Sequence, residues 1–238
     1  MISKHLNRFF LMSVASMGFA NASLTSFSAS SGAGGYAYST IYNNRIMDFS
    51  DFGPTINYSH TELAWDQFDD MAAYAEMNFS DTLTGSATHA QLSGSGHNMV
   101  LIDATFNAGY QVGYAFGTLD FVLDNVGTVT LDSTITKALT ITPDAYIHSF
   151  LVLDGTAYTV NPTNYSNTIS VGAGIHQAYF YEYVYSGYAT NGGSGKSILD
   201  ASYNIAVDSG APVPEPCSLL AFGAALVGSV RRAGKARR

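Results

Sequence analysis

The sequence predicts a mainly β protein: an antiparallel β-sandwich of jelly-roll-like order, with a signal helix at its N-terminus and a short hydrophobic helix at its C-terminus. From about Thr82 onward, apolar and polar residues alternate with a period of two, as on strands that bury one face. Gly, Asn and Asp interrupt this alternation at turn-like spacings, as in Asp154-Gly155. Strand and helix patterns do not alternate along the chain, so two antiparallel sheets packed face to face is the simplest architecture.

The strands are predicted in chain order from these patterns. Residues 23–60 are rich in Ser, Gly, Tyr and Asn, and we expect either a first strand or a loose collar there. Residues 62–80 fit two patterns, one face of a helix or strict alternation, and we favour a strand over 71–80. Further strands are predicted at 99–106, 110–116, 118–123, 128–133, 135–141, 146–153, 168–171, 175–185 and 198–207.

The N-terminus has the three parts of a secretory signal peptide. Lys4 and Arg8 supply a basic region, and an apolar run of eleven residues follows from Phe9 to Phe19. The small residues Ala20 and Ala22 then fit a signal-peptidase site, and we expect cleavage after Ala22. The apolar run is too short to span a bilayer.

The C-terminus combines a proline-rich tether, an apolar run and a basic tail. Three of the five residues 212–216 are prolines, which excludes a helix or a central strand there. Cys217 to Val230 contains no charge, and Arg231 and Arg232 follow it. A helix of that length rises only about 21 Å, so we expect a transient membrane stop with its basic tail on the cytoplasmic side.

These C-terminal residues resemble a known sorting signal. Val213, Pro214, Glu215 and Pro216, with the apolar run and the terminal arginines, are similar to the PEP-CTERM sorting domain of Gram-negative bacteria that make exopolysaccharide. The resemblance covers residues 212–238. It implies recognition by an exosortase, a membrane-embedded cysteine transpeptidase, and delivery to the cell envelope, outer surface or extracellular matrix.

The segment between the two ends differs in composition from the whole chain. Residues 1–22 are assigned to the signal peptide, 23–211 to a single β-sandwich domain and 212–238 to the sorting signal. Between Ser23 and Ala211 three basic residues stand against seventeen acidic ones, a formal charge of −14. This segment contains no cysteine, which excludes disulfides and thiol catalysis. Such an acidic surface should repel nucleic acid and anionic lipid.

The sequence contains little that predicts catalysis or metal binding. The acidic cluster Glu62, Asp66, Asp69 and Asp70 offers oxygen ligands to Ca²⁺, but it lacks an EF-hand pattern, and a solvated acidic face is the favoured interpretation. The histidines show no spacing typical of metal ligands. No cofactor and no catalytic residue is assigned. Two carboxylates meeting across a cleft, as in glycosidases, remain an alternative.

The most informative interior segment is Ile175 to Tyr185. Its four tyrosines, Tyr179, Tyr181, Tyr183 and Tyr185, share one face of a strand, and Glu182 shares the other face with apolar residues. If the tyrosines point outward, they form an exposed ladder able to stack on sugar rings, and Glu182 is buried. Burying a carboxylate is costly, so we favour tyrosines that point inward.

Two classes of function follow. The favoured one is a non-catalytic surface or matrix protein, exported through signal peptidase, sorted by exosortase and associated with extracellular polysaccharide or biofilm. The alternative is a secreted hydrolase of polysaccharide or peptide that uses a carboxylate pair in a loop-lined cleft. Nucleic acid is not an expected partner.

Overall fold

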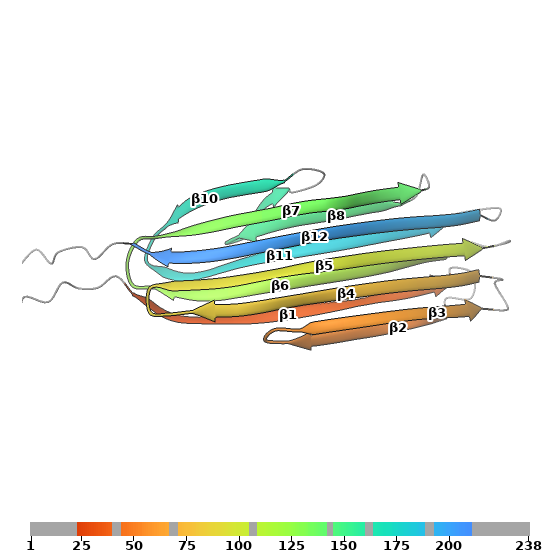
Figure 1. Cartoon of the computed structure of the whole chain (residues 1–238), viewed down its shortest axis with the longest axis horizontal. Helices are drawn as coiled ribbons and strands as arrows, with labels where there is room; N and C mark the ends of the chain where they lie inside the picture. Colours follow the sequence, from red (N-terminus) through yellow and green to blue (C-terminus); the bar gives the residue numbers. More distant parts are fainter. Residues whose placement is uncertain are drawn as a thin grey trace, which may run out of the picture. The chain divides into compact units, whose positions relative to one another are not determined.

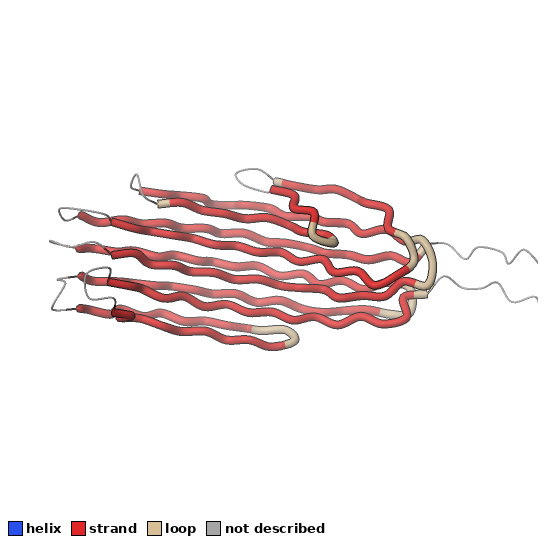
Figure 2. The backbone as a smooth tube through the Cα atoms, turned by 180° about the vertical axis from the view of Figure 1, so that it is seen from behind, coloured by secondary structure: helices blue, strands red, loops and turns tan. Residues whose placement is uncertain are grey.

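A computed structural model describes residues 23–39, 44–66, 71–104, 109–141, 145–159, 164–188 and 193–210. These ranges contain twelve β-strands and no helix (Figure 1, Figure 2). The strands are β1 (Leu24–Ser39), β2 (Asn44–Gly53), β3 (Asn57–Asp66), β4 (Met71–Gly85), β5 (His89–Ala104), β6 (Gly109–Leu123), β7 (Gly127–Ile141), β8 (Tyr146–Leu153), β9 (Thr156–Thr159), β10 (Tyr165–Val171), β11 (Gly174–Tyr188) and β12 (Gly193–Ser209).

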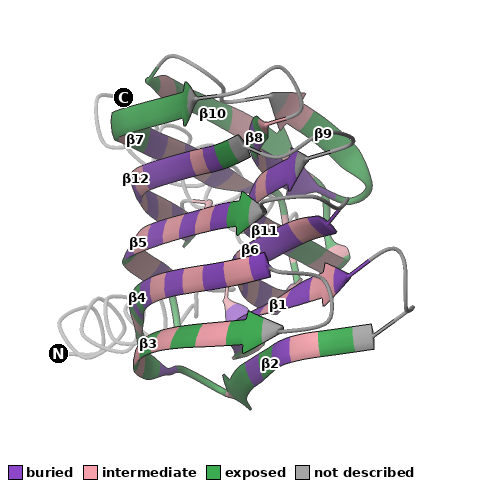
Figure 3. Cartoon of the chain, turned by 90° about the vertical axis from the view of Figure 1, so that its right-hand side faces the viewer, coloured by how far each residue is buried: buried purple, intermediate pink, exposed green. Residues whose placement is uncertain are grey.

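The strands form two antiparallel sheets of six. Sheet A has the order β2-β1-β6-β11-β8-β9, and sheet B has the order β10-β7-β12-β5-β4-β3. The sheets pack face to face, with β5 against β6 and β11 against β12. Along β4, β5 and β12, buried positions alternate with more exposed ones, so each strand has one face in the core (Figure 3). The predicted β-sandwich is confirmed.

The strand order differs from the jelly roll that the sequence predicts. A jelly roll has eight strands in Greek-key order, whereas here β3, β4 and β5 form a meander within sheet B, and β8 and β9 form a hairpin within sheet A. The turn of that hairpin has positive φ at both Asp154 (49°) and Gly155 (78°), as a tight two-residue turn requires. Short turns also carry the chain from one sheet to the other, as between β10 and β11, so turn-forming residues locate the turns without giving the strand order.

Two pairs of predicted strands are single long strands. The break expected at Gly117 does not exist, because β6 runs through it and pairs there with β11. A Cβ at Gly117 would lie 1.9 Å from the Tyr203 hydroxyl oxygen, so this glycine makes room for a ring from the opposite sheet. The Tyr203 ring is stacked on Phe180, with centroids 4.5 Å apart. In the same way, β7 runs through the gap left between 133 and 135.

The two uncertain segments are both strands. Residues 71–80 belong to β4, whose buried positions include Met71, Met77 and Phe79, so the favoured strand is confirmed. Most of residues 23–60 lie in β1, β2 and the start of β3 rather than in a loose collar. Strand β12 begins at Gly193, five residues before the predicted strand at 198–207.

The described domain begins and ends at one end of the sandwich. The Leu24 amide donates to the Ala87 carbonyl at 2.8 Å, and the Ser209 amide donates to the Thr88 carbonyl at 2.9 Å. Both ends of the domain therefore meet at the turn between β4 and β5. We call this the near end and the opposite one, where β1, β3 and β11 finish, the far end (Figure 1).

Several predictions fall outside the described residues. These are the signal helix with Ala20 and Ala22, the sorting motif at 213–216, the apolar run at 217–230 and the arginines 231 and 232. Within the described ranges, no helix has the length and apolar character needed to cross a bilayer.

Candidate functional site

Strand β11 has its tyrosines on the outside of sheet A. Ala178, Phe180, Glu182 and Val184 are completely buried between the sheets, whereas the four tyrosines are partly exposed. The favoured inward orientation of the tyrosines is therefore wrong. The aliphatic and phenyl side chains that share the inner face with Glu182 outweigh the cost of burying one carboxyl group.

Space for that carboxyl group comes from a glycine on the opposite sheet. The Glu182 Oε1 atom lies 2.5 Å from where a Cβ of Gly96 would be, so no larger residue fits at position 96 without a shift. Among the residues that the structure describes, neither carboxyl oxygen has a hydrogen-bond partner. Burial, with a smaller contribution from the negative charge of Asp200, raises the pKa of Glu182 to about 8. The group is thus largely protonated and uncharged at neutral pH.

Outside sheet A, tyrosines from four neighbouring strands form a continuous row. Tyr38 of β1, Tyr110 of β6, Tyr185 of β11 and Tyr146 of β8 follow the strand order of the sheet. Their ring centroids are 5.5 Å apart for Tyr38 and Tyr110, 5.7 Å for Tyr110 and Tyr185, and 4.6 Å for Tyr185 and Tyr146. We call these four residues the tyrosine row. It lies toward the far end of the sandwich, because β1 and β11 finish close to it.

More aromatic side chains extend the row toward the middle of the sheet. Tyr183 lies 5.8 Å from Tyr146 and 6.3 Å from Tyr181, and Phe150 lies 5.1 Å from Tyr181. At the other end Tyr36 contacts Tyr110 edge-on at 6.1 Å. We call the row together with its neighbours the aromatic face: Tyr36, Tyr38, Tyr110, Tyr146, Phe150, Tyr181, Tyr183 and Tyr185.

Neighbouring rings in the row are nearly parallel. The interplanar angles are 21° for Tyr110 and Tyr185 and 13° for Tyr185 and Tyr146, at separations close to the spacing of neighbouring strands. The Tyr185 ring and hydroxyl lie over Gly187 of the same strand, so a side chain at position 187 would collide with them. Val112, paired across the strands with Tyr36 and Tyr185, is only 1% exposed although it points outward.

The aromatic face carries no net negative charge. On β1, on β8 and on the outward side of β11 there is no acidic residue, and Glu182 points inward. Strand β6 carries Asp120 on its outward side, toward the near end, where it accepts a hydrogen bond from Gln177. Arg45 lies 5.0 Å from the centre of the Tyr36 ring at the edge of the face and pairs with Asp48. Burial raises the pKa of Tyr181 to about 12. Burial and a hydrogen bond with Tyr146 raise the pKa of Tyr183 further. These phenols are therefore neutral at physiological pH.

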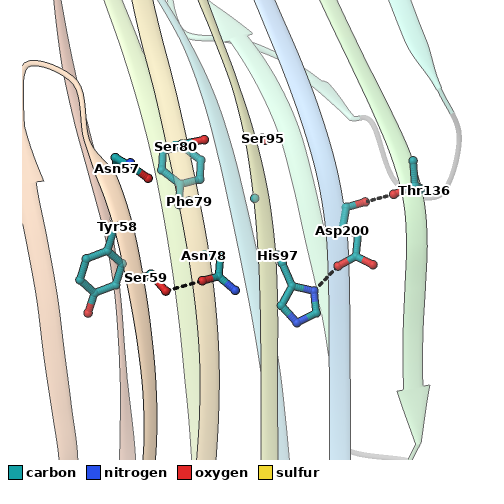
Figure 4. A pocket seen from close by; sticks show the side chains of 11 residues that line it. Asn57, Tyr58, Ser59, Asn78, Phe79, Ser80, Ser95, His97, Thr136 and Asp200 are labelled. Carbon is teal, nitrogen blue, oxygen red and sulfur yellow. Dashed lines mark hydrogen bonds and ion pairs between the residues drawn. The ribbon is translucent and has the colours of Figure 1, made fainter.

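The outer face of sheet B is polar and slightly hollowed. An open hollow there is lined by residues of β3, β4, β5, β7 and β12 (Figure 4). His97 Nδ1 contacts the Asp200 carboxylate, the Thr136 hydroxyl donates to the Asp200 carbonyl at 3.4 Å, and the Ser59 hydroxyl donates to Asn78 at 2.7 Å. Asp200 is the one carboxylate among the residues lining this hollow. The pair of facing carboxylates expected of a glycosidase is not assembled in it.

The acidic cluster proposed for Ca²⁺ is described only in part. Glu62 of β3 contacts the His60 ring, 2.9 Å from Oε2 to Nε2, and Asp66 ends the same strand. Asp69 and Asp70 lie outside the described residues. Among the residues that the structure does describe, no three His, Cys, Asp or Glu side chains are grouped to hold a metal ion.

Four histidines pair with carboxylates, which spacing along the chain did not reveal. Besides His60 and His97, His89 contacts Asp208 at 2.7 Å and His176 contacts Asp154 at 2.8 Å. The His89 and His97 pairs join β5 to β12, where each histidine stands opposite its aspartate. For His89 and His97 the strand register brings the partners together, whereas His60 and Glu62 are two residues apart on one strand.

Sequence reasoning found part of the aromatic face. The tyrosines of β11 were recognised as one set, but Tyr36, Tyr38, Tyr110, Tyr146 and Phe150 were missed. The sequence pattern that could have indicated Tyr36 and Tyr38 is tyrosine at alternate positions in a segment otherwise rich in small residues. Which strands are neighbours of β11 could not be read from that signal.

Comparison of the chain with protein-family models and with curated proteins gives no match. Among solved structures, the crystal structure of a GH31 alpha-xylosidase from Xanthomonas citri matches over 73% of this chain at 7% identity, with a TM-score of 0.18. The matched part is 34% of the xylosidase chain. A likeness this weak assigns neither a fold nor an activity to this chain.

Proposed function

We propose that this chain is an exported, C-terminally sorted surface or matrix protein without catalytic activity, which uses the aromatic face of sheet A to associate with extracellular polysaccharide. The observation that carries the proposal is the continuous set of tyrosine rings across β1, β6, β11 and β8. Monomeric proteins seldom expose large contiguous aromatic surfaces without a binding role. Tyrosine also combines apolar area with a hydroxyl group that hydrogen-bonds sugars.

The two chain ends support export and sorting. Signal peptidase would remove residues 1–22, and an exosortase would process the chain near Pro214, Glu215 and Pro216 while the run 217–230 holds it at the membrane. The domain, which has no cysteine between Ser23 and Ala211, needs no oxidising partner outside the cell. We place the product in the envelope, on the outer surface or in the matrix of a Gram-negative bacterium.

The alternative function, a hydrolase, would have to act on the polar side of the molecule. Asp200 is the carboxylate among the residues that line the hollow on sheet B, and it contacts His97, whose other ring nitrogen lies 4.0 Å from Glu76 of β4. A hydrolase of the expected kind needs two carboxyl groups about 5 to 10 Å apart on either side of its substrate. Replacement of Asp200 therefore separates the two functions.

Fractionation tests the sorting half of this proposal. The full chain and a chain lacking residues 212–238 are expressed in a host that has an exosortase, with Lys196→Gln in the domain as a matched control. We expect the full chain and the control in the envelope or matrix fraction and the shortened chain in another fraction. Identical fractionation of all three would refute sorting by the C-terminus.

Incubation with the host's own polysaccharide tests the functional half. We expect the exported protein to be retained by the polymer and to release no new reducing ends. Release of sugars that disappears in Asp200→Asn would contradict a non-catalytic role. Failure of the polymer to retain the protein would contradict the binding role.

A further inference from the structure

We propose that the domain assembles head to tail with further copies of itself, because the two edges of sheet B have complementary steps and β3 of one copy fits beside the uncovered part of β7 in another. This inference goes beyond the proposed function. It names a second copy of this chain as the partner, and it uses the edges of the sheet and not the aromatic face.

The outermost strands of sheet B each cover only part of their neighbour. Strand β3 pairs with residues 71–80 of β4, toward the far end, and β10 pairs with residues 127–133 of β7, toward the near end. Figure 1 shows β3 and β10 displaced in this way at opposite edges. The pairing through β4, β5, β12 and β7 places β10 level with residues 81–85 of β4, and β3 level with residues 134–141 of β7. The two edges therefore have steps that complement each other.

The part of β7 that β10 does not cover is exposed on both of its faces. Residues 136–140 are all exposed, whereas buried and partly exposed positions alternate over 127–133. Thr136 is the extra residue of a bulge, and from Lys137 to Ile141 the strand pairs regularly with β12. On its other side this stretch has no partner strand within the described ranges. An uncovered strand edge of this kind can accept an added strand through its backbone.

A second copy in the same orientation fits the steps in both directions. Strands β3 and β7 both run from the near end toward the far end, so β3 of one copy would add to β7 of another as a parallel strand. In the same contact β10 comes to lie beside residues 82–85 of β4, which β3 leaves uncovered. Sheet A is staggered in the same direction, because β2 pairs with residues 31–39 of β1 and β9 with residues 150–153 of β8.

The charges at the two edges favour contact between unlike edges. Strand β3 contains Glu62 and Asp66. Residues 134–141 of β7 contain Lys137 as their one charged residue, and β10 contains none. Two β3 edges would therefore repel each other, whereas a β3 edge attracts the edge that carries Lys137.

Exposed apolar side chains lie at the same contact. Leu63 and Trp65, on the outer face of β3, are 72% and 57% exposed, and Leu139, on the outer face of β7, is 39% exposed. At the level fixed by the strand pairing, Leu139 of one copy is opposite Thr61 and next to Leu63 of the other. Burial of these side chains adds a hydrophobic contribution to the backbone hydrogen bonds of the added strand.

Assembly of this kind is open-ended. Each contact uses one edge of a copy and leaves the opposite edge available, so copies add one after another instead of closing into a dimer. The twist of the sheets makes the product a twisted filament. A filament presents many aromatic faces to one polymer, which raises the avidity of the assembly above the affinity of a single copy.

Cross-linking between single-cysteine copies tests which edges meet. The exported protein has no cysteine between Ser23 and Ala211, and Cys217→Ser removes the remaining one. In this background one protein carries Thr61→Cys in β3 and another carries Leu139→Cys in β7. A short bis-maleimide is added to each protein alone and to the mixture. Ile175→Cys, at an 84% exposed residue of the near end, is the matched control.

We expect cross-linked dimers only in the mixture of Thr61→Cys with Leu139→Cys, and a ladder of larger products when one chain carries both substitutions. A cross-link formed by either of these proteins alone would show like edges in contact and would overturn the head-to-tail arrangement. Equal cross-linking of Ile175→Cys to either protein would show that the contact is not specific to the edges, and would overturn it as well.

Light scattering and sedimentation of the protein without cross-linker measure the assembly itself. Ala138→Asp with Thr140→Asp makes the exposed edge of β7 acidic and should raise the concentration needed for assembly about tenfold or more. Val126→Asp with Ile175→Asp adds the same charge to exposed residues of the near end, and this control should assemble like the wild type. Circular dichroism and thermal unfolding verify that each variant is folded.

Two results of this measurement would overturn assembly through the strand edges. One is a wild-type protein that stays monomeric at every concentration, and the other is equal assembly of the β7 variant and its control. Both would leave polysaccharide binding by a single copy, and therefore the proposed function, standing.

Discussion

The two outer faces of this sandwich contrast more strongly than its two sheets do. At the far end of sheet A the central strands carry stacked tyrosines on their outward side, whereas in the middle of sheet B the outward side carries His97, Asp200, Asn78 and other polar groups. The middle of sheet B is the usual case for a sheet with one face in water, although Leu63 and Trp65 are exposed apolar residues on its edge strand β3. In sheet A the polar outward residues of β6 and β11, such as Asp120 and Gln177, lie toward the near end, and the far end is aromatic. Hydrophobicity alone therefore does not distinguish core from surface at the far end of sheet A.

The largest expected effect distinguishes the inward face of β11 from its outward face. Phe180→Ala should lower the free energy of unfolding by about 3 to 5 kcal/mol, because it empties space against Tyr203 in the core. Tyr181→Ala, the next residue along the strand, should cost no more than about half as much, because its ring is partly exposed. Urea unfolding of both variants measures the difference. Equal costs would mean that the two faces of β11 are not assigned correctly.

The next effect concerns the pH dependence that Glu182 gives to stability. Its pKa is raised to about 8 in the folded protein, against about 4.3 in an unfolded chain. Between these values the folded protein holds a proton that the unfolded chain has released. Stability contributed by this group is therefore complete below about pH 4 and is lost as pH rises toward 8. Glu182→Gln should abolish that decline and make the protein more stable than wild type at about pH 8 by a few kcal/mol.

Denaturant unfolding from about pH 5 to about pH 9 measures this dependence. Glu76→Gln, on the outer face of sheet B beside Tyr74, is the matched control and should leave the decline in place. A wild-type protein whose stability does not fall between these pH values would show that Glu182 is not buried as a neutral acid.

The smallest effect compares one new charge on each outer face. Tyr185→Asp should destabilise the fold by about 2 kcal/mol, because it removes stacking with Tyr110 and Tyr146 and uncovers Val112 beside a carboxylate. Asn78→Asp, at an exposed position of sheet B, should stay within about 0.5 kcal/mol of wild type. Thermal unfolding at neutral pH measures both. An equally small loss of stability in the two variants would show that the tyrosines do not form a packed layer on sheet A.

Alternation and turn-forming residues in the sequence predicted several strands and one turn correctly. The bounds of β8, the strand at 71–80 and the turn at Asp154-Gly155 follow from alternation and from turn-forming residues. Gly117 looked like a break because a glycine in a strand usually is one. Its actual reason, the hydroxyl of Tyr203 from the opposite sheet, is a contact between residues far apart in sequence.

The candidate site was less predictable for a related reason. One strand of it, β11, could be recognised from sequence, but the orientation of that strand depended on two opposing costs: exposing Phe180 and Val184, or burying Glu182. The presence of Gly96 opposite Glu182 tips the balance, and nothing near position 182 in the sequence reveals it. The remaining tyrosines joined the site through strand order, which local patterns do not encode.

The position of β12 has a mechanical consequence. The chain leaves the described domain after Ser209, and β12 is flanked in sheet B by β5 on one side and by β7 on the other. A pull on Gly210 along the strand therefore loads two ladders of hydrogen bonds in shear, all at once, instead of peeling an edge strand one bond at a time. The load reaches both neighbours of β12 before any strand can detach, so the domain should resist tension applied through its C-terminus better than tension applied through an edge strand such as β3 or β10.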